Sequence, residues 1–324
     1  MFFILSVATI AFAVSCLGTR ALIAVLRRRA VLDRPNERSS HVAPTPRGGG
    51  IAVIGASVAA WLVFAVARIV PPSTVAVALA AVGLAIVSWL DDLRDLSPAV
   101  RLLAQFAVVV VGILALPHGA IFQGWLPPAL DAIAAALLWV WFVNLFNFMD
   151  GIDGIDASEA ISIGLGLALI AGSDFALAAP AATIVGAALG FLVWNWAPAR
   201  IFMGDVGSVP LGYLLGFLLY ELALRGQWVP ALILPAYFLV DATLTLLRRL
   251  ARGERIWQAH REHFYQRAVQ RGLSHAAVVL RVTAANIVLI ACAGAAAGGW
   301  GFAALGVAVL TVVALLVELG RARH

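Results

Sequence analysis

The stretch AIAAALLWVWFVNLFNFMDGIDGIDASEA, residues 132–160, changes character within a few positions. Its first part, residues 132–143, is wholly apolar and is typical of a membrane-spanning helix. The remainder carries two asparagines, three aspartates and a glutamate. Polar side chains are costly to bury in lipid, so an apolar helix that ends in these oxygen-bearing groups indicates a functional site at its end.

The composition of the whole chain also indicates a membrane protein. Of its 324 residues, 63% are hydrophobic and 12% are charged, and the mean hydropathy is +0.98. Soluble domains contain roughly 25% charged residues, so no soluble core accounts for this much apolar surface. We predict an all-α polytopic membrane protein in which residues 1–324 form a single integral domain.

Apolar segments predict about eleven transmembrane helices. The first resembles a signal peptide, but its arginines follow the apolar run instead of preceding it. This order predicts an uncleaved first helix with the N-terminus outside (periplasmic) and, by alternation, a cytoplasmic C-terminus. The expected spans are residues 2–26, 50–69, 73–90, 101–116, 129–147, 159–172, 176–195, 208–224, 229–247, 277–297 and 300–318.

The arginines support this orientation. The net charge of +5 comes from arginine alone, because the chain has no lysine. Only Arg68 and Arg225 fall at the outer ends of the predicted spans, as the positive-inside rule expects. Topology therefore explains the high pI, and we expect no nucleic acid partner. The predicted inner segments are 27–49, 91–100, 148–158, 196–207, 248–276 and 319–324.

The first inner loop ends in PTPRGGG, residues 44–50. The N–H groups of Gly48 and Gly49, at the start of a helix, can bind an anion. Arg47 adds a bidentate donor suited to phosphate. The alternative is a flexible turn with a topology-setting arginine, and three glycines alone do not decide between the two.

The second inner loop, DDLRDLSPAVRLLAQ, begins with a pair of acids. At 100° per residue, Asp91 and Asp95 share a helix face and Asp92 is turned away. Crowded carboxylates suit Mg²⁺, which also engages substrate phosphates, although Arg94 and Arg101 could simply pair with them. We favour a chemical role for Asp91 and Asp92, and a capping role for Asp95.

The third inner loop is the polar part of residues 132–160. Asn144, Asn147 and Asp150 recur every three residues and share one arc of a helix. Two glycines then allow Asp153 to turn back towards that arc. The alternative for these four residues is hydrogen bonding between helices. We predict that Asp156 caps the next helix, with Glu159 at its third position.

The last two inner loops add an acid and a basic box. Asp205 lies between glycines in FMGDVGSVPLG and can cap a helix or ligate a metal. His260 and His263 are too few to indicate zinc, and beside arginines such as Arg267 they suit a diphosphate or nucleotide better. An amphipathic helix on anionic headgroups is the alternative. Asp241, inside the ninth predicted span, requires a partner such as arginine or histidine.

Together these loops resemble the polyprenyl-phosphate N-acetylhexosamine-1-phosphate transferases of glycosyltransferase family 4, the branch that starts O-antigen, common-antigen and teichoic-acid synthesis. The matching pieces occur in family order on alternate inner loops, between about residues 30 and 270. HREHFYQR differs from the run of histidines in the related peptidoglycan enzymes, which argues against a muramoyl-pentapeptide donor. The pieces are SSHVAPTPRGGG, DDLRDLSPAVRLLAQ, NLFNFMDGIDG, FMGDVGSVPLG and HREHFYQR.

The resemblance implies an enzyme of the bacterial inner membrane with its active site on the cytoplasmic face. It would transfer a sugar 1-phosphate from a UDP-N-acetylhexosamine, such as UDP-GlcNAc, to undecaprenyl phosphate and release UMP. Cell-surface polysaccharide or cell-wall synthesis would begin with this step. A membrane aromatic prenyltransferase and a transporter are the alternatives, but neither needs this ordered set of loops.

The resemblance also implies roles for residues. Mg²⁺ or Mn²⁺ would be held by Asp205, with Asn147 and Asp150 completing the site. One of Asp91 and Asp92 would deprotonate or orient the lipid phosphate, with Asp91 slightly favoured and a covalent phospho-aspartyl route left open. The expected catalytic set is Asp91, Asp92, Asp150 and Asp153, and the expected substrate-binding set is Arg47, Gly48, Gly49, Asn144, His260, His263 and Arg267.

Two further expectations concern packing. Cys16 and Cys292 lie in apolar segments and are expected to be buried core residues without a disulfide. The small-residue run AGAAAGG, residues 293–299, would permit close helix packing and a homodimer.

Overall fold

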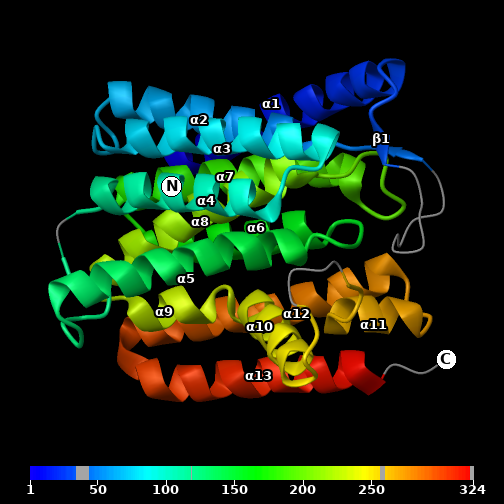
Figure 1. Ribbon diagram of the computed structural model, residues 1–324. Helices are drawn as coiled ribbons and strands as arrows, with labels where there is room; N and C mark the ends of the chain where they lie inside the picture. Colours follow the sequence, from blue (N-terminus) through cyan, green and yellow to red (C-terminus); the bar gives the residue numbers. More distant parts are fainter. Residues whose placement is uncertain (34–43, 118, 256–259, 322–324) are drawn as a thin grey trace.

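The computed structural model describes residues 1–33, 44–117, 119–255 and 260–321. Within these residues the chain is a bundle of helices that run mostly along one axis (Figure 1). The helices are α1 (Phe2–Arg28), α2 (Gly50–Val66), α3 (Thr74–Arg94), α4 (Pro98–Ala115), α5 (Pro128–Phe148), α6 (Ile155–Ala171), α7 (Phe175–Asn195), α8 (Asp205–Leu224), α9 (Trp228–Ile233), α10 (Ala236–Ala251), α11 (Phe264–Gln270), α12 (His275–Ala295), the π-helical turn η1 (Ala296–Trp300) and α13 (Gly301–Arg321).

A short hairpin is the only sheet in the described part of the chain. Strand β1 (Leu32–Asp33) pairs antiparallel with β2 (Thr45–Pro46), with Leu32 opposite Pro46. The hairpin follows α1 and precedes α2 at the end of the bundle that also carries α11 (Figure 1). It anchors the segment that leads into the glycine-rich start of α2.

The helices confirm a helical, multi-pass membrane protein. Seven continuous helical stretches of the described chain are long and apolar enough to span a bilayer, and α2 is a shorter apolar helix. One of the seven, His275–Arg321, consists of α12 and α13, which bend apart at Gly299, where φ is +100°. Helices occupy all the segments predicted to span, while the number of spans and their orientation remain predictions.

The ninth predicted span, residues 229–247, is not one helix. It consists of α9 and α10, which are separated at Leu234 and Pro235. Proline lacks an N–H donor and clashes with the preceding turn, so it breaks a continuous helix at this position. In Figure 1, α10 is consequently oriented differently from the long helices around it.

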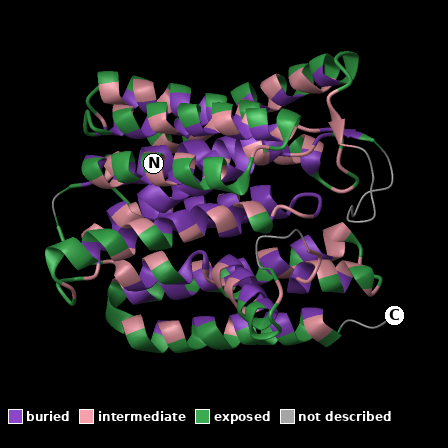
Figure 2. Cartoon of the chain, viewed as in Figure 1, coloured by how far each residue is buried: buried purple, intermediate pink, exposed green. Residues whose placement is uncertain are grey.

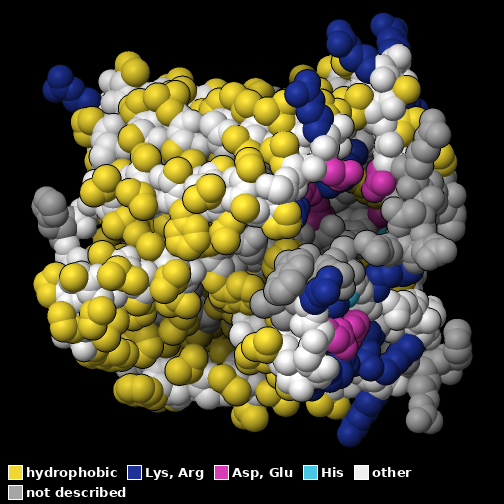
Figure 3. Space-filling model, viewed as in Figure 1, with side chains coloured by type: hydrophobic (Ala, Val, Ile, Leu, Met, Phe, Trp, Pro, Cys, Tyr) yellow, Lys and Arg dark blue, Asp and Glu magenta, His cyan; other side chains and the backbone are white. Residues whose placement is uncertain are grey.

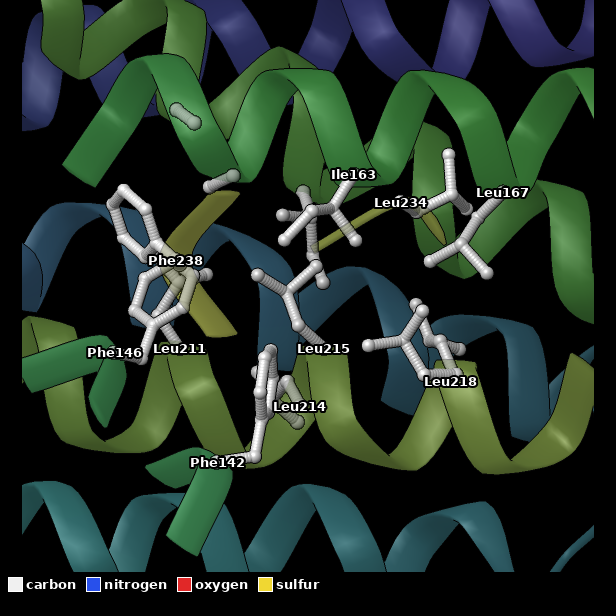
Figure 4. Packing of buried hydrophobic residues seen from close by; sticks show 14 of the residues in the cluster. Phe142, Phe146, Ile163, Leu167, Leu211, Leu214, Leu215, Leu218, Leu234 and Phe238 are labelled. Carbon is white, nitrogen blue, oxygen red and sulfur yellow. The ribbon is translucent and has the colours of Figure 1, made fainter. Parts of the chain in front are cut away.

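The core is centred on α8. Nearly all of its residues are buried, and it packs against α2, α3, α5, α6 and α7. Figure 2 shows buried residues concentrated in these inner helices and exposed residues on the outer ones. In Figure 4, leucines of α8 interdigitate with side chains of α5, α6 and α10, for example Leu214 with Phe142. This packing fixes the position at which α8 begins.

Outer helices present large apolar side chains to their surroundings. Val66, Leu114 and Phe302 are 86%, 80% and 83% exposed. In water this surface would be strongly unfavourable, whereas lipid solvates it. In the view of Figure 3, the acidic side chains and most of the basic ones gather around a hollow at one end of the molecule. The described parts of the predicted inner segments lie at this end, because helices alternate in direction between them (Figure 1).

Candidate active site

Asp92, in the last turn of α3, binds the first turn of α8. Its Oδ1 accepts a hydrogen bond from the N–H of Asp205 at 3.3 Å, and its Oδ2 accepts one from Val206 at 3.1 Å. The first N–H groups of a helix lack intrahelical partners and carry partial positive charge, so a carboxylate stabilises them. The Asp92 side chain is 1% exposed. It ties α3 to the start of the central helix.

Arg47 connects the same two acids. Its Nη2 lies 2.7 Å from Asp92 Oδ1 and 2.7 Å from Asp205 Oδ1. The guanidinium therefore neutralises part of the charge of two neighbouring carboxylates. Arg47, Asp92 and Asp205 form an ion triad. Three predicted inner loops that are far apart in the sequence meet there.

The glycines after Arg47 have a packing role. The N–H groups of Gly48 and Gly49 both donate to the carbonyl of Phe202, at 3.1 and 2.9 Å. Because these donors already have partners, the geometry gives no support to the prediction that they bind an anion. At Gly50 a Cβ would overlap the backbone of Gly207, so α2 and α8 begin in backbone contact.

Asn147 and Asn144 lie one turn apart near the end of α5. Asn147 donates from Nδ2 to Asp205 Oδ2 at 3.4 Å, and its Oδ1 accepts from Ser208 Oγ at 2.6 Å. In this orientation the amide supports Asp205. Asn144 donates from Nδ2 to Gln105 Oε1 at 2.6 Å and to the Val140 carbonyl. Both asparagines line the same cavity.

Asp91 has different partners from Asp92. Its Oδ2 lies 3.1 Å from Arg101 Nη1, and its Oδ1 accepts from the N–H of Leu96 at 2.7 Å. Asp91 therefore fixes the turn between α3 and α4 and orients Arg101. Asp95 takes a left-handed conformation with φ of +50° at the C-cap of α3, in agreement with the predicted capping role.

Asp150 lies in the loop between α5 and α6, and the charges of the ion triad affect its pKa. Burial and the negative charge of Asp205 raise the pKa of Asp150 to about 7, and the positive charge of Arg47 opposes this shift. Three carboxylates thus influence one another near a single arginine. When all three are ionised, their negative charge exceeds the single positive charge of Arg47.

Asp153 makes hydrogen bonds between segments, the alternative expected for it, and its catalytic role stays a prediction. Asp153 Oδ2 accepts from the N–H of Ala199 at 3.0 Å and lies 3.3 Å from His275 Nδ1, so it joins the loop to α12 and to the segment before α8. The prediction that Asp156 caps α6 is wrong. Gly154, with φ of +80°, is the N-cap residue, and Asp156 lies buried in the first turn. Glycine adopts this conformation without the strain that a side chain introduces.

The segment HREHFYQR, residues 260–267, is the histidine box, and Asp241 of α10 anchors it. Asp241 Oδ1 lies 3.2 Å from His263 Nδ1 and accepts from the N–H of Phe264 at 3.1 Å. Tyr237 donates to Asp241 Oδ2. His263 is thus the partner that Asp241 required. Its side chain is 2% exposed, so this contact is buried.

His260 is more accessible than His263, and their rings lie 4.9 Å apart. Burial, followed by the charges of His263 and Arg249, lowers the pKa of His260 to about 4. The ring is neutral at pH 7, and its Nδ1 accepts from the N–H of Glu262 at 3.4 Å. Its Nε2 is therefore a hydrogen-bond donor. Arg267 is exposed on α11.

The histidine box touches the loop that carries Asp150. Tyr265 donates its hydroxyl proton to the Phe148 carbonyl at 3.1 Å. A Cβ at Gly151 would overlap the same hydroxyl. The fifth inner segment therefore closes over the third, and a glycine makes the approach possible.

Two cavities of different character meet at the ion triad. One, with a volume of about 310 Å³, contains Arg101, Asn144, Asn147 and Asp205 and is otherwise lined largely by apolar side chains of α3, α4, α5, α8 and α10. The other, of about 170 Å³, is lined by Arg47 and Asp92 together with Val31, Leu32, Asp33 and Trp89. Asp205 lines the first and Asp92 the second, while Arg47 touches both acids.

Within the described residues, no group of three histidine, cysteine or acidic side chains converges closely enough to hold a metal by itself. The donors nevertheless fit magnesium, which commonly binds one or two carboxylates and takes its other ligands from water and phosphate. Asp205 and the excess negative charge around it provide such an environment. The same set offers no cysteine or histidine that would favour zinc.

The fold and this centre define a multi-pass membrane protein with an acidic site where an apolar groove meets a polar pocket. Residues 74–223, which carry Asp91, Asp92, Asp150 and Asp205, match the family model described as glycosyl transferase family 4. The chain belongs to this family.

Relatives of the chain are named as phosphosugar transferases. A probable undecaprenyl-phosphate N-acetylglucosaminyl 1-phosphate transferase of Bacillus subtilis is 29% identical, over 84% of this chain and 80% of its own. A decaprenyl-phosphate N-acetylglucosaminephosphotransferase of Mycobacterium tuberculosis is 30% identical, with coverages of 78% and 72%. A phospho-N-acetylmuramoyl-pentapeptide-transferase of Synechococcus is 32% identical, with coverages of 76% and 80%.

Proposed function

We propose that this protein transfers an N-acetylhexosamine 1-phosphate from a UDP-sugar to a polyprenyl phosphate such as undecaprenyl phosphate. An oxygen of the lipid phosphate would attack the β-phosphorus of the UDP-sugar. The bond from that phosphorus to the bridging oxygen would break, and UMP would leave with the bridging oxygen. The products would be a polyprenyl-diphosphate sugar and UMP.

The observation that supports this proposal is the meeting of two unlike cavities at one acidic centre. The larger groove combines an apolar lining with Arg101, which suits a lipid phosphate. The smaller pocket, with Arg47 and Trp89, suits a water-soluble anionic nucleotide. Two anions brought together in this way repel each other, so positioning and charge neutralisation would supply most of the catalysis.

Residues of the chain would take distinct parts. Arg101, oriented by Asp91, would hold the lipid phosphate, while Asn144 and Asn147 line its path to Asp205. Asp91 and Asp92 each accept at least two hydrogen bonds and so would orient other groups. No general base is required, because a phosphate monoester with a second pKa near 6 is already largely doubly ionised at pH 7.

Magnesium held at Asp205, with Asp150 nearby, would neutralise charge on the diphosphate as the bond to UMP breaks. His260, neutral and with its proton on Nε2, would donate a hydrogen bond to the donor substrate. We assign the reaction to the cytoplasmic face of the bacterial inner membrane, where the predicted inner loops and nucleotide sugars meet.

The proposal is tested with purified protein, undecaprenyl phosphate, Mg²⁺ and separate UDP-sugars. UDP-GlcNAc, UDP-GalNAc and UDP-N-acetylmuramoyl-pentapeptide form the panel. We expect UMP release that requires both lipid and Mg²⁺ with a simple N-acetylhexosamine donor. We expect none with the muramoyl-pentapeptide donor, because the histidine box departs from that branch.

Two variants complete this test. Asp205→Asn is expected to remove at least 99% of the turnover, while Arg94→Gln, at an exposed end of α3, retains it. Substantial activity of Asp205→Asn would contradict the metal assignment. Absence of UMP release with every donor would contradict the reaction itself.

A further inference from the structure

Arg47 lies between the two acids that would neighbour a bound divalent cation. We propose that Arg47 is an exchangeable counter-ion: it holds Asp92 and Asp205 together in the free enzyme and moves to the donor diphosphate when a divalent cation reaches Asp205. The inference rests on the proposed function, because it assigns a cation and a nucleotide to this site. It adds a coupling between the binding of the two.

Arg47 is the most exposed member of the ion triad. A single nitrogen, Arg47 Nη2, is 2.7 Å from an oxygen of each acid. The Arg47 side chain is 35% exposed, whereas Asp92 is 1% and Asp205 17% exposed. The guanidinium can therefore leave towards the open side, while the acids stay in place.

The main chain on both sides of Arg47 is fixed. Pro46 accepts at its carbonyl from the N–H of Phe202 at 2.8 Å, and Gly48 donates to the Phe202 carbonyl at 3.1 Å. Movement of Arg47 is thus confined to rotation about its side-chain bonds. Because Arg47 already lines the polar pocket with Trp89 and Asp33, rotation within that pocket keeps it beside a bound nucleotide.

Asp92 and Asp205 differ in the hydrogen bonds that they keep when Arg47 leaves. Asp92 keeps the N–H groups of Asp205 and Val206 as donors. Asp205 keeps only the long 3.4 Å contact from Asn147 among its described hydrogen bonds. A carboxylate with so little compensation needs a replacement cation. The exchange therefore places the divalent cation at Asp205 and leaves Asp92 bound to α8.

Exchange predicts reciprocal coupling between cation and nucleotide. A cation that displaces Arg47 frees a guanidinium for the diphosphate, and a diphosphate that attracts Arg47 frees Asp205 for the cation. By linkage, each ligand tightens the other by the same factor. A static Arg47 would instead weaken cation binding equally with and without nucleotide.

The test measures Mn²⁺ binding by electron paramagnetic resonance, without lipid, so that no turnover occurs. Wild type, Arg47→Gln and the charge-matched control Arg94→Gln are each titrated with and without UDP. We expect Arg47→Gln to bind Mn²⁺ about tenfold tighter than wild type without UDP, and no tighter than wild type with UDP. Arg94→Gln should match wild type in both titrations, and Arg47→Lys should lie between.

Each outcome bears on the inference. A gain in Mn²⁺ affinity of equal size with and without UDP would show a static arginine and overturn it. Equal Mn²⁺ affinities of Arg47→Gln and wild type without UDP would also overturn the inference. Wild type that turns over but shows no UDP dependence of Mn²⁺ binding would remove the inference and leave the proposed function standing. Circular dichroism and size exclusion establish that the variants are folded.

Discussion

Asp91 and Asp92 are adjacent in the chain but act on different helices. Asp91 contacts Arg101 near the start of α4. Asp92 contacts Arg47 and the start of α8. The helical rotation of 100° between neighbours separates them. The sequence predicted that they point in different directions, but not which of them reaches Asp205. That choice depends on how α8 packs, which single-sequence periodicity does not report.

A pH dependence follows from Asp150. Because its pKa is raised to about 7, its carboxyl is protonated below this pH and negatively charged above it. Cation binding should strengthen as the pH rises. We expect Mn²⁺ affinity to increase about tenfold between pH 6 and pH 8, the change produced by one proton that competes with the cation.

Two variants identify the group responsible for this dependence. Asp150→Asn should bind Mn²⁺ more weakly and show little change between pH 6 and pH 8. His275→Gln, which alters the neighbouring contact to Asp153, should keep the wild-type slope. His260 does not titrate in this range, since its pKa is about 4. An unchanged slope in Asp150→Asn would contradict the assignment.

At the scale of elements, the contact between α2 and α8 determines the distance between Arg47 and Asp205. A methyl group at Gly50 would overlap Gly207, whereas a methyl group at Gly55 on the same helix would meet nothing within 4 Å. We expect Gly50→Ala to lower the free energy of unfolding by about 1–3 kcal/mol, the usual effect of overpacking, and to reduce turnover. Gly55→Ala should retain both, as measured by thermal unfolding in detergent and by UMP release. Equal behaviour of the two variants would contradict the role of this contact.

A second connection between elements runs from α10 to the histidine box. Asp241 is fully buried and binds His263, the N–H of Phe264, Tyr237 and Thr245. In Asp241→Asn the amide N–H₂ replaces one accepting oxygen, so α11 should be held less firmly. We expect faster amide hydrogen exchange over residues 263–270, with a smaller change in Thr245→Val. Wild-type exchange in Asp241→Asn would show that the box is held by other contacts.

The elements also show where sequence reasoning succeeds and fails. Apolar runs gave the positions of the long helices, because lipid requires about 20 apolar residues for each span. They missed the break before α10, although Pro235 carried the signal. Asp156 beside Ser158 and Glu159 resembled a capping motif, yet Gly154 ended up as the N-cap. The role of Gln105 was hidden inside an apolar run, and only packing brings it to Asn144.

For the whole molecule, the predicted orientation can be tested with cysteine labels. In a Cys16→Ala, Cys292→Ala background, Arg68→Cys should react with a membrane-impermeant maleimide from outside intact cells. Arg94→Cys should react only after the membrane is opened, because it lies at the charged end of the bundle. Both arginines are exposed, which makes the sites comparable. Reversed labelling would invert the topology and place the site on the other face.

The sequence predicted which residues gather at the site, but not which of them contact one another. Ordered motifs on alternate loops indicated which residues gather at one end of the bundle. They did not show that Gly48 and Gly49 use their N–H groups on Phe202, or that Arg47 joins Asp92 to Asp205. These features depend on contacts between segments more than 100 residues apart, which local propensity does not encode.

The separation of Asp92 from its partners has a consequence for biosynthesis. Asp92 and Asp205 are 113 residues apart, and ribosomes add roughly 5–20 residues per second. The ribosome therefore needs on the order of ten seconds to synthesise the first turn of α8 after it has synthesised Asp92. Until then the carboxylate of Asp92 must remain hydrated at the surface of the bilayer, since burial without a partner is costly. The nascent chain can thus thread most of its helices into the membrane first, and the reaction centre closes only when the central helix is inserted between them.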